Sequence, residues 1–262
     1  MPTGFERRSS THLGVRRDVY VRGEGPGVLV MHEVPGITPT VAEAGRRIAD
    51  AGFTVWMPDL FGEVDRPFSL PYSFAQLGRA CVAKEFHCLA RDHASPITEW
   101  LRALGRELQE SRGQEGAAIG AVGMCLTGGF ALALMVDPWV RAPVLSQPSL
   151  PFPVSPAHAR ALHVSPEDLV TIRRRATEEG VPVLGMRFSH DAMCPRARFE
   201  RLRAELGDGF EAIEIDSGPG NPHGLPPIAH SVISHDFRDV EGHPTRAAFD
   251  RMIAFFREQL GR

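Results

Sequence analysis

The chain has 262 residues, of which 43% are hydrophobic and 23% charged, and its net charge is -3. This length suits one large α/β domain or two small ones, and the charge gives no reason to expect nucleic acid as a partner. No apolar run is long enough for a membrane span, and residues 1–17 lack the apolar segment of a secretory signal. Four cysteines are too few for a disulfide framework, which favours a cytoplasmic protein.

Apolar runs alternate with helical patterns along the chain, which predicts an α/β fold with a mostly parallel sheet and helices on both faces. Residues 27–32 are almost wholly apolar, as expected of a strand buried on both sides. We predict strands at residues 18–22, 27–32, 53–57, 117–122, 142–146, 181–188 and 210–216, the first of them at a sheet edge. We predict helices at residues 39–51, 97–110, 129–135, 166–179 and 245–260.

Two long segments, residues 63–99 and 147–180, interrupt this alternation. We assign residues 1–262 to a single domain and treat both segments as excursions from its sheet. Long insertions at the carboxyl ends of strands often shape the mouth of a site. Surface helices that only cover the sheet would give the same pattern, so both interpretations stay open.

The segment Gly123-Met124-Cys125-Leu126-Thr127-Gly128-Gly129 follows a short apolar strand and leads into a helical pattern. It has the form of a nucleophile elbow with a thiol in place of the usual serine. The N-terminus of the helix would favour the thiolate form. A buried, inert cysteine is the alternative, but this position favours a catalytic Cys125. Thr127 stands where the tight turn prefers glycine, so we expect a slightly wider turn.

Asp191 comes shortly after the apolar run 181–188, where a carboxylate that orients a catalytic histidine is expected. A helix N-cap before Pro195 is the alternative role for this residue. Four histidines follow the last predicted strand, and His230 is our choice for the general base, with His223 as the main competitor. The order Cys, Asp, His along the chain is that of α/β hydrolases.

Glu33 ends an apolar strand, and a carboxylate there is costly unless it is paired or functional. It lies within reach of the Cys125 thiol in the predicted fold, whereas the alternative is an ion pair with a surface arginine. The loop after this strand normally supplies one N–H of an oxyanion hole. We assign the two N–H groups to Val34 and Leu126.

The chain resembles the dienelactone hydrolase family of the α/β-hydrolase superfamily. The resemblance rests on residues 32–36, 52–60, 123–126, 191–195 and 229–231, which span nearly the whole chain in the right order. It implies a Cys–His–Asp triad in which Glu33 helps to form the thiolate when substrate is bound. The best-known members hold a substrate carboxylate with arginines, one of them four residues after the histidine. Ser234 occupies that position here, and Arg238 is not in register.

The sequence therefore predicts a cysteine-dependent hydrolase of a small ester or lactone, acting through Cys125, His230, Asp191 and Glu33. We expect a small-molecule substrate, no nucleic acid or membrane partner, no cofactor and no metal. The sequence leaves the oligomeric state open and is compatible with a homo-oligomer. The alternative is a non-catalytic ligand-binding or scaffolding protein on the same fold, because a fold does not prove a function.

Overall fold

The computed structural model describes residues 1–83, 85–113 and 117–261. Their strands form one sheet in the order β1-β2-β4-β3-β5-β6-β7-β8. The strands β3 to β8 are parallel, whereas β1 and β2 pair in antiparallel fashion at one edge. The bounds are β1 (Glu6–His12), β2 (Val15–Arg22), β3 (Gly27–Met31), β4 (Thr54–Pro58), β5 (Ile119–Met124), β6 (Val140–Ser146), β7 (Val183–Phe188) and β8 (Phe210–Ile215).

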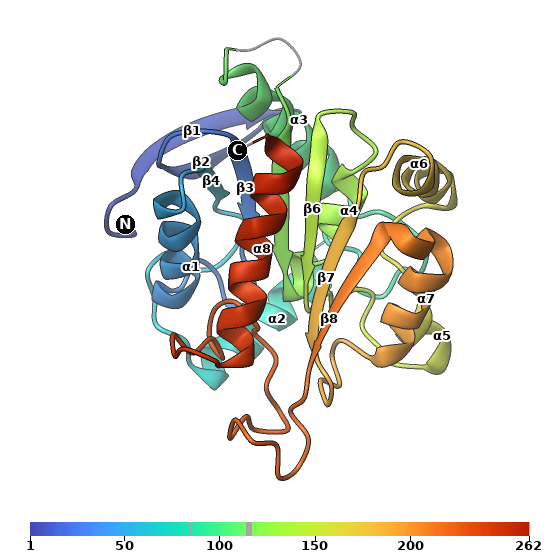
Figure 1. Ribbon diagram of the computed structural model, residues 1–262. Coiled ribbons are helices and arrows are strands. Elements are labelled where there is room, and N and C mark those ends of the chain that lie inside the picture. The colour runs from blue at the N-terminus through green and yellow to red at the C-terminus, as the bar shows by residue number, and fades with distance from the viewer. Residues whose placement is uncertain (84, 114–116, 262) are drawn as a thin grey trace.

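Helices cover both faces of the sheet (Figure 1). On one face lie α1 (Pro39–Asp50) and α8 (Pro244–Leu260). The opposite face is covered by α3 (Ile97–Glu110), α4 (Phe130–Leu134), α6 (Pro166–Thr177) and α7 (Arg196–Leu206). The side chains of β3 alternate between the two layers, since Val28 and Val30 contact the first and Leu29 and Met31 the second. The sheet is thus buried on both sides, as its apolar strands require.

The α/β fold predicted from the sequence is confirmed, and the predicted helix at residues 97–110 has the observed bounds. At the amino-terminal edge of the sheet, the position of one predicted strand was wrong and another strand was not predicted. The strand predicted at residues 18–22 extends to Val15–Arg22 and is not an edge strand, because β1 pairs outside it. The strand that was not predicted is β1, whose sequence, Glu-Arg-Arg-Ser-Ser-Thr-His, has no apolar alternation. The pattern is missing because this edge strand is exposed along most of its length.

The first excursion contains α2 (Leu70–Val82), and the second contains α5 (Pro156–Arg160) together with α6. A buried arginine of α7, Arg198, anchors the second excursion to the domain. Its guanidinium donates hydrogen bonds to the backbone carbonyls of Pro148, Pro151, His158 and Ala161. One side chain thus donates to four backbone carbonyls of this segment, which fixes its course.

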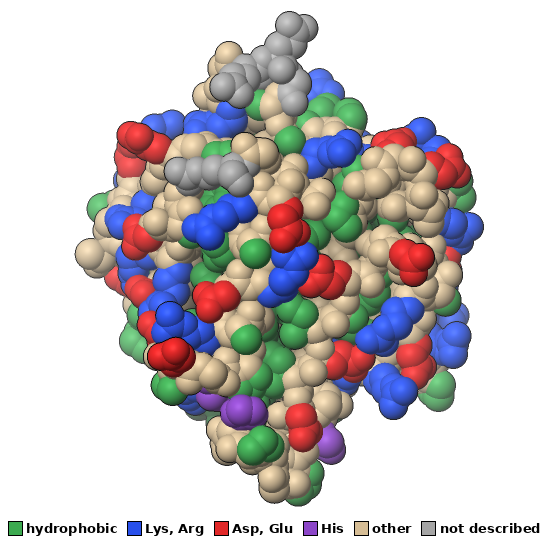
Figure 2. All heavy atoms as spheres, in the orientation of Figure 1, with side chains coloured by type: hydrophobic (Ala, Val, Ile, Leu, Met, Phe, Trp, Pro, Cys, Tyr) green, Lys and Arg blue, Asp and Glu red, His purple; other side chains and the backbone are tan. Residues whose placement is uncertain are grey.

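The outer face formed by α1 and α8 carries interspersed arginine and acidic side chains (Figure 2). Among the described residues, no helix combines the length and apolar character that a membrane span requires. The loop between β8 and α8 extends past the carboxyl ends of the parallel strands (Figure 1). Because β3, β5, β6 and β7 also end at this edge, the predicted site residues converge there.

Candidate active site

Cys125 lies at a sharp turn between β5 and a short 3-10 turn, Cys125–Thr127, that precedes α4. Its φ angle of 54° lies in the left-handed region, which a residue other than glycine adopts only under local constraint. Glycines make the turn possible. A Cβ atom on Gly123 would lie 2.1 Å from the carbonyl oxygen of Thr127, and one on Gly128 would lie 2.5 Å from the Cα atom of Pro148. The backbone therefore has the geometry of a nucleophile elbow.

Thr127, which stands where the tight turn prefers glycine, bonds this turn to the neighbouring strand. Its hydroxyl donates to the carbonyl oxygen of Met31 at 2.8 Å and accepts from the backbone N–H of Met124 at 3.0 Å. The side chain is fully buried. A threonine can replace glycine here because its hydroxyl satisfies backbone groups at the ends of β3 and β5.

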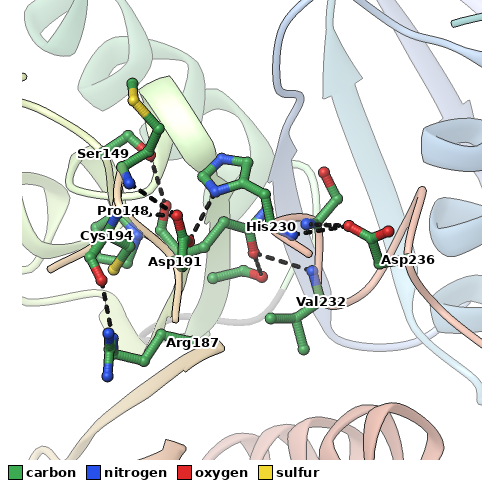
Figure 3. A network of polar contacts seen from close by, with 12 residues as sticks. Pro148, Ser149, Arg187, Asp191, Cys194, His230, Val232 and Asp236 are labelled. Atoms are coloured by element: carbon green, nitrogen blue, oxygen red, sulfur yellow. Dashed lines mark hydrogen bonds and ion pairs between the residues drawn. The ribbon is translucent and has the colours of Figure 1, made fainter. Parts of the chain in front are cut away.

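His230 and Asp191 meet at the carboxyl edge of the sheet (Figure 3). The imidazole Nδ1 lies 2.7 Å from the carboxylate Oδ2 of Asp191. A second aspartate holds the backbone of the histidine, because Asp236 Oδ2 accepts the N–H groups of His230 and Ser231 at 2.8 and 2.9 Å. Both the ring and the main chain of His230 are thereby fixed.

Hydrogen bonds to the backbone on its carboxyl side fix the loop that carries Asp191. The other carboxylate oxygen of Asp191 accepts the N–H groups of Met193 and Cys194 at 2.8 and 3.2 Å. Arg187, at the end of β7, donates to the carbonyl oxygen of Cys194 at 2.8 Å (Figure 3). Asp191 thus holds the turn before α7 with one oxygen and contacts His230 with the other, whereas the N-cap of α7 is Pro195 and not Asp191.

A ring nitrogen of His230, the Cys125 sulfur and a Glu33 carboxylate oxygen all lie within 4.8 Å of one another. Since Nδ1 is bonded to Asp191, the nitrogen that faces the thiol is Nε2, which is buried without a hydrogen-bond partner among the described residues. Burial alone would lower the pKa of His230. The nearby Cys125 thiolate and Asp191 carboxylate outweigh it and hold this pKa well above its usual value.

His223, the competing candidate for the base, lies elsewhere. It is exposed, and its ring centroid is 5.5 Å from that of His243. Its backbone N–H bonds to the side chain of Asn221. The structure therefore brings His230 to Cys125 and Asp191, and leaves His223 on the outer part of the same loop.

Glu33 is held by neutral donors. Its Oε2 accepts from the hydroxyl of Ser231 at 2.8 Å and from the amide of Gln147 at 3.2 Å, and its Oε1 accepts from the hydroxyl of Ser234. Among the described residues, no arginine forms a hydrogen bond or ion pair with it, so the alternative interpretation, an ion pair with a surface arginine, is not observed. Burial raises the pKa of Glu33, although these hydroxyls and His230 oppose the effect.

Gln147 was not identified from the sequence, although it links two parts of the site. Its Oε1 accepts the backbone N–H of Val232 at 3.3 Å, so the same side chain contacts both Glu33 and the histidine loop. The residue is fully buried and has a φ angle of 35°. The feature of the sequence that could have identified Gln147 is its position, a polar residue immediately after the buried strand β6, at the edge of the sheet where sites form.

His32 is a structural neighbour of Glu33. Its Nε2 accepts the backbone N–H of Leu60 at 3.0 Å, and its Nδ1 is 3.0 Å from the carbonyl oxygen of Glu33. Complete burial lowers its pKa to about 4, so the ring is neutral and donates through Nδ1. This contact fixes the main chain at the point where Glu33 and Val34 leave β3.

Both excursions contribute residues to the buried apolar cluster that contains Cys125. Phe86 and Cys88 from the first, and Leu150 and Phe152 from the second, belong to the same buried cluster as Cys125. The residues assigned to the oxyanion hole also lie here. Leu126 is buried in the 3-10 turn, and Val34 packs against the cluster. Cys125 as a whole is 9% exposed.

Comparisons with solved structures agree with this architecture. A protein from Klebsiella pneumoniae subsp. pneumoniae, named as a candidate dienelactone hydrolase, is 19% identical with a TM-score of 0.62, over 97% of this chain and 98% of that chain. A dienelactone hydrolase-like promiscuous phosphotriesterase from metagenomic libraries is 17% identical with a TM-score of 0.58, over 98% of both chains.

A dienelactone hydrolase from Anabaena variabilis is 14% identical with a TM-score of 0.61, over 98% of this chain and 99% of that chain. At these identities the similarity shows the α/β-hydrolase fold. A search of curated proteins finds no significant match. The model of the dienelactone hydrolase family matches residues 17–260, so the chain belongs to this family and is a hydrolase of carboxylic esters or lactones.

Proposed function

We propose that this protein hydrolyses a small ester or lactone with Cys125 as the nucleophile, His230 as the general base and Asp191 as the orienting carboxylate. The observation that supports this most directly is the alignment of His230, which is bonded to Asp191 through Nδ1 while Nε2 faces the thiol. A base held by a third group and directed at a nucleophile is the arrangement that covalent catalysis requires.

In the acylation step, the Cys125 thiolate attacks the carbonyl carbon and forms a carbon–sulfur bond. The oxyanion that develops is stabilised by the N–H groups of Val34 and Leu126, a contribution of about 3 kcal/mol per donor in known cases. When the tetrahedral intermediate collapses, the carbon–oxygen bond breaks and the His230 imidazolium protonates the leaving alcohol. In a lactone, the alcohol stays attached to the acyl group.

In the deacylation step, neutral His230 removes a proton from water, and the resulting hydroxide attacks the thioester. The carbon–sulfur bond breaks, the carboxylic acid leaves, and the thiolate and imidazolium are restored. Glu33 would assist before acylation by accepting the thiol proton and passing it to His230, which then holds it as imidazolium. Its raised pKa and its position beside the sulfur suit that role.

We further propose that the substrate is uncharged near the scissile bond. Among the described residues, the side chains that hold Glu33 are two hydroxyls and one amide, and none of them carries a positive charge that could form an ion pair with a substrate carboxylate. Arg238 donates to the carbonyl oxygens of His235 and Phe237 at the surface. The buried carboxyl group of Glu33 would repel an anionic substrate once it ionises.

The hydrolysis of p-nitrophenyl acetate by the wild type, Cys125→Ala and Cys88→Ala tests this function. Cys88 is a matched control, because it is a second buried cysteine of the same apolar cluster. We expect activity in the wild type and Cys88→Ala, and its loss in Cys125→Ala. Equal rates in all three proteins would refute the nucleophile.

A non-catalytic binding protein on this fold would behave differently toward thiol reagents. At neutral pH an active site of this kind gives one cysteine that alkylates far faster than the other three, whereas a binding protein gives none. All four cysteines are free, so each can be compared by mass spectrometry.

The free thiols also support our proposal of a cytoplasmic location.

A further inference from the structure

The groups that face each other at the site form a donor set for a soft divalent metal. Within the described residues, Glu33, Cys125 and His230 are the one group of three or more possible ligands whose donor atoms all lie within 4.8 Å of one another. They supply one sulfur, one nitrogen and one oxygen, the three donor types that zinc takes in proteins. Tetrahedral zinc places its donor atoms about 3.5 Å apart, so each pair of donor atoms would need to close in by at most about 1.3 Å.

The surroundings of His230 match those of a zinc ligand. A zinc-bound histidine almost always donates its other ring N–H to a carboxylate or carbonyl oxygen, which fixes the tautomer and the ring orientation. Asp191 occupies that position at 2.7 Å from Nδ1. The remaining nitrogen, Nε2, is buried and has no hydrogen-bond partner among the described residues. It is therefore already directed at the point where a metal would bind.

Glu33 also retains a binding position. A carboxylate has about four lone-pair sites, and the hydroxyls of Ser231 and Ser234 and the amide of Gln147 use three of them. Two of these bonds fall on Oε2 and one on Oε1, which leaves a lone pair on Oε1. The three donors hold the carboxylate in place, as supporting hydrogen bonds do around known metal ligands.

We propose that Cys125, His230 and Glu33 bind a zinc ion reversibly, in competition with substrate. The metal would form one bond each to sulfur, nitrogen and oxygen and keep a fourth position for water. The proton displaced from the thiol or the imidazolium passes to solvent. Zinc acts here as an inhibitor and not as a cofactor, since it occupies the thiolate and imidazole that the reaction needs. Binding does not depend on the proposed function, and only the inhibition does.

Zinc affinity can be measured on the full chain by competition with a chromophoric chelator. We expect one ion per wild-type molecule, with binding weakened at least tenfold in Cys125→Ala and in Glu33→Gln. Asp191→Asn, which changes only the support of the histidine, should weaken binding about 10- to 100-fold. Magnesium should neither bind nor inhibit, because thiolate and imidazole are poor ligands for it. Circular dichroism of each variant shows that it is folded.

The control is the double variant Cys81→Ser and Cys88→Ser. These two cysteines line a surface cavity together with His87 and His93, and this cavity is the competing location for zinc. The double variant should bind zinc as the wild type does. Loss of binding in the double variant, retention of it in Cys125→Ala, or no binding to the wild type would each overturn the proposal. An inactive wild type that still binds zinc through Cys125 would refute the proposed function alone.

Discussion

The Nδ1 atom of His230 lies 2.7 Å from Asp191 Oδ2, although the two residues are 39 positions apart in the chain. Each partner is fixed separately, His230 by the two N–H groups that Asp236 accepts and Asp191 by the turn before α7. The contact is therefore held in place by backbone structure on both sides. Such preorganisation is what a general base needs before the reaction begins.

Asp191→Asn should lower kcat by about 10²- to 10⁴-fold, because the imidazole loses its orientation and its anionic partner. The variant should also shift the pH profile. The pKa of His230 is raised in the folded protein, so its imidazolium is fully formed below pH 6.5 and is lost as the pH rises through the raised value. The stability that the ion pair with Asp191 gives the folded state follows the same pH dependence. We expect the alkaline limb of kcat/KM above pH 6.5 in the wild type and at lower pH in Asp191→Asn. Identical limbs would contradict the assignment.

Glu33→Gln should change how stability depends on pH. Because the pKa of Glu33 is raised in the folded protein, the folded state binds more protons than the unfolded state above pH 4.5. The free energy of unfolding therefore falls as the pH rises through this window, by at most about 1.4 kcal/mol per pH unit for one proton. Urea denaturation at pH 5 and pH 8 should show a larger loss in the wild type than in the variant. Equal losses would mean that Glu33 does not titrate there.

Thr127→Val tests the bond between the turn and β3. Valine keeps the shape but leaves the N–H of Met124 and the carbonyl oxygen of Met31 without their partner. We expect a loss of about 1–3 kcal/mol in the free energy of unfolding. Thr127→Ser, which keeps the hydroxyl, is the matched control and should lose far less. A Thr127→Val protein as stable as Thr127→Ser would rule out this role.

The preference for neutral substrates can be measured with two esters of equal size, one of which carries a carboxylate on the acyl part. We expect kcat/KM to favour the neutral ester by at least tenfold, because no arginine in the described part of the chain bonds to Glu33 and its carboxyl group lies near the thiol. A preference for the anionic ester would show that a cation reaches the site from another part of the chain.

The parallel part of the sheet could be predicted because its strands are buried on both sides and read as apolar runs. The edge strand β1 could not, since its exposed residues carry no apolar alternation. The bounds of α3 agree with prediction because its buried residues repeat with helical spacing. In the excursions, the helix predicted at residues 166–179 corresponds to α6, whereas α2 and α5 were not predicted. In α2 only Tyr72, Gln76 and Ala80 are buried, which leaves little pattern.

At the site, Cys125 and Asp191 could be located from the sequence because both follow apolar strands that end at the same edge. The choice between His223 and His230 could not be made from spacing, since loop residues obey no period. Gln147 was missed because its role depends on three-dimensional contact with Glu33 and Val232, which are remote in sequence. Thr127 was judged a departure from the pattern, but its hydroxyl bonds to the end of β3.

The most direct test of the central claim is to trap the acyl-enzyme. The wild type is mixed with a slowly hydrolysed ester, quenched in acid, and examined by intact mass spectrometry and peptide mapping. We predict one added acyl group, located on Cys125, that disappears as product forms and is absent in Cys125→Ala. An acyl group on another residue would contradict Cys125 as the nucleophile. So would turnover of the ester with no covalent intermediate in either the wild type or Asp191→Asn.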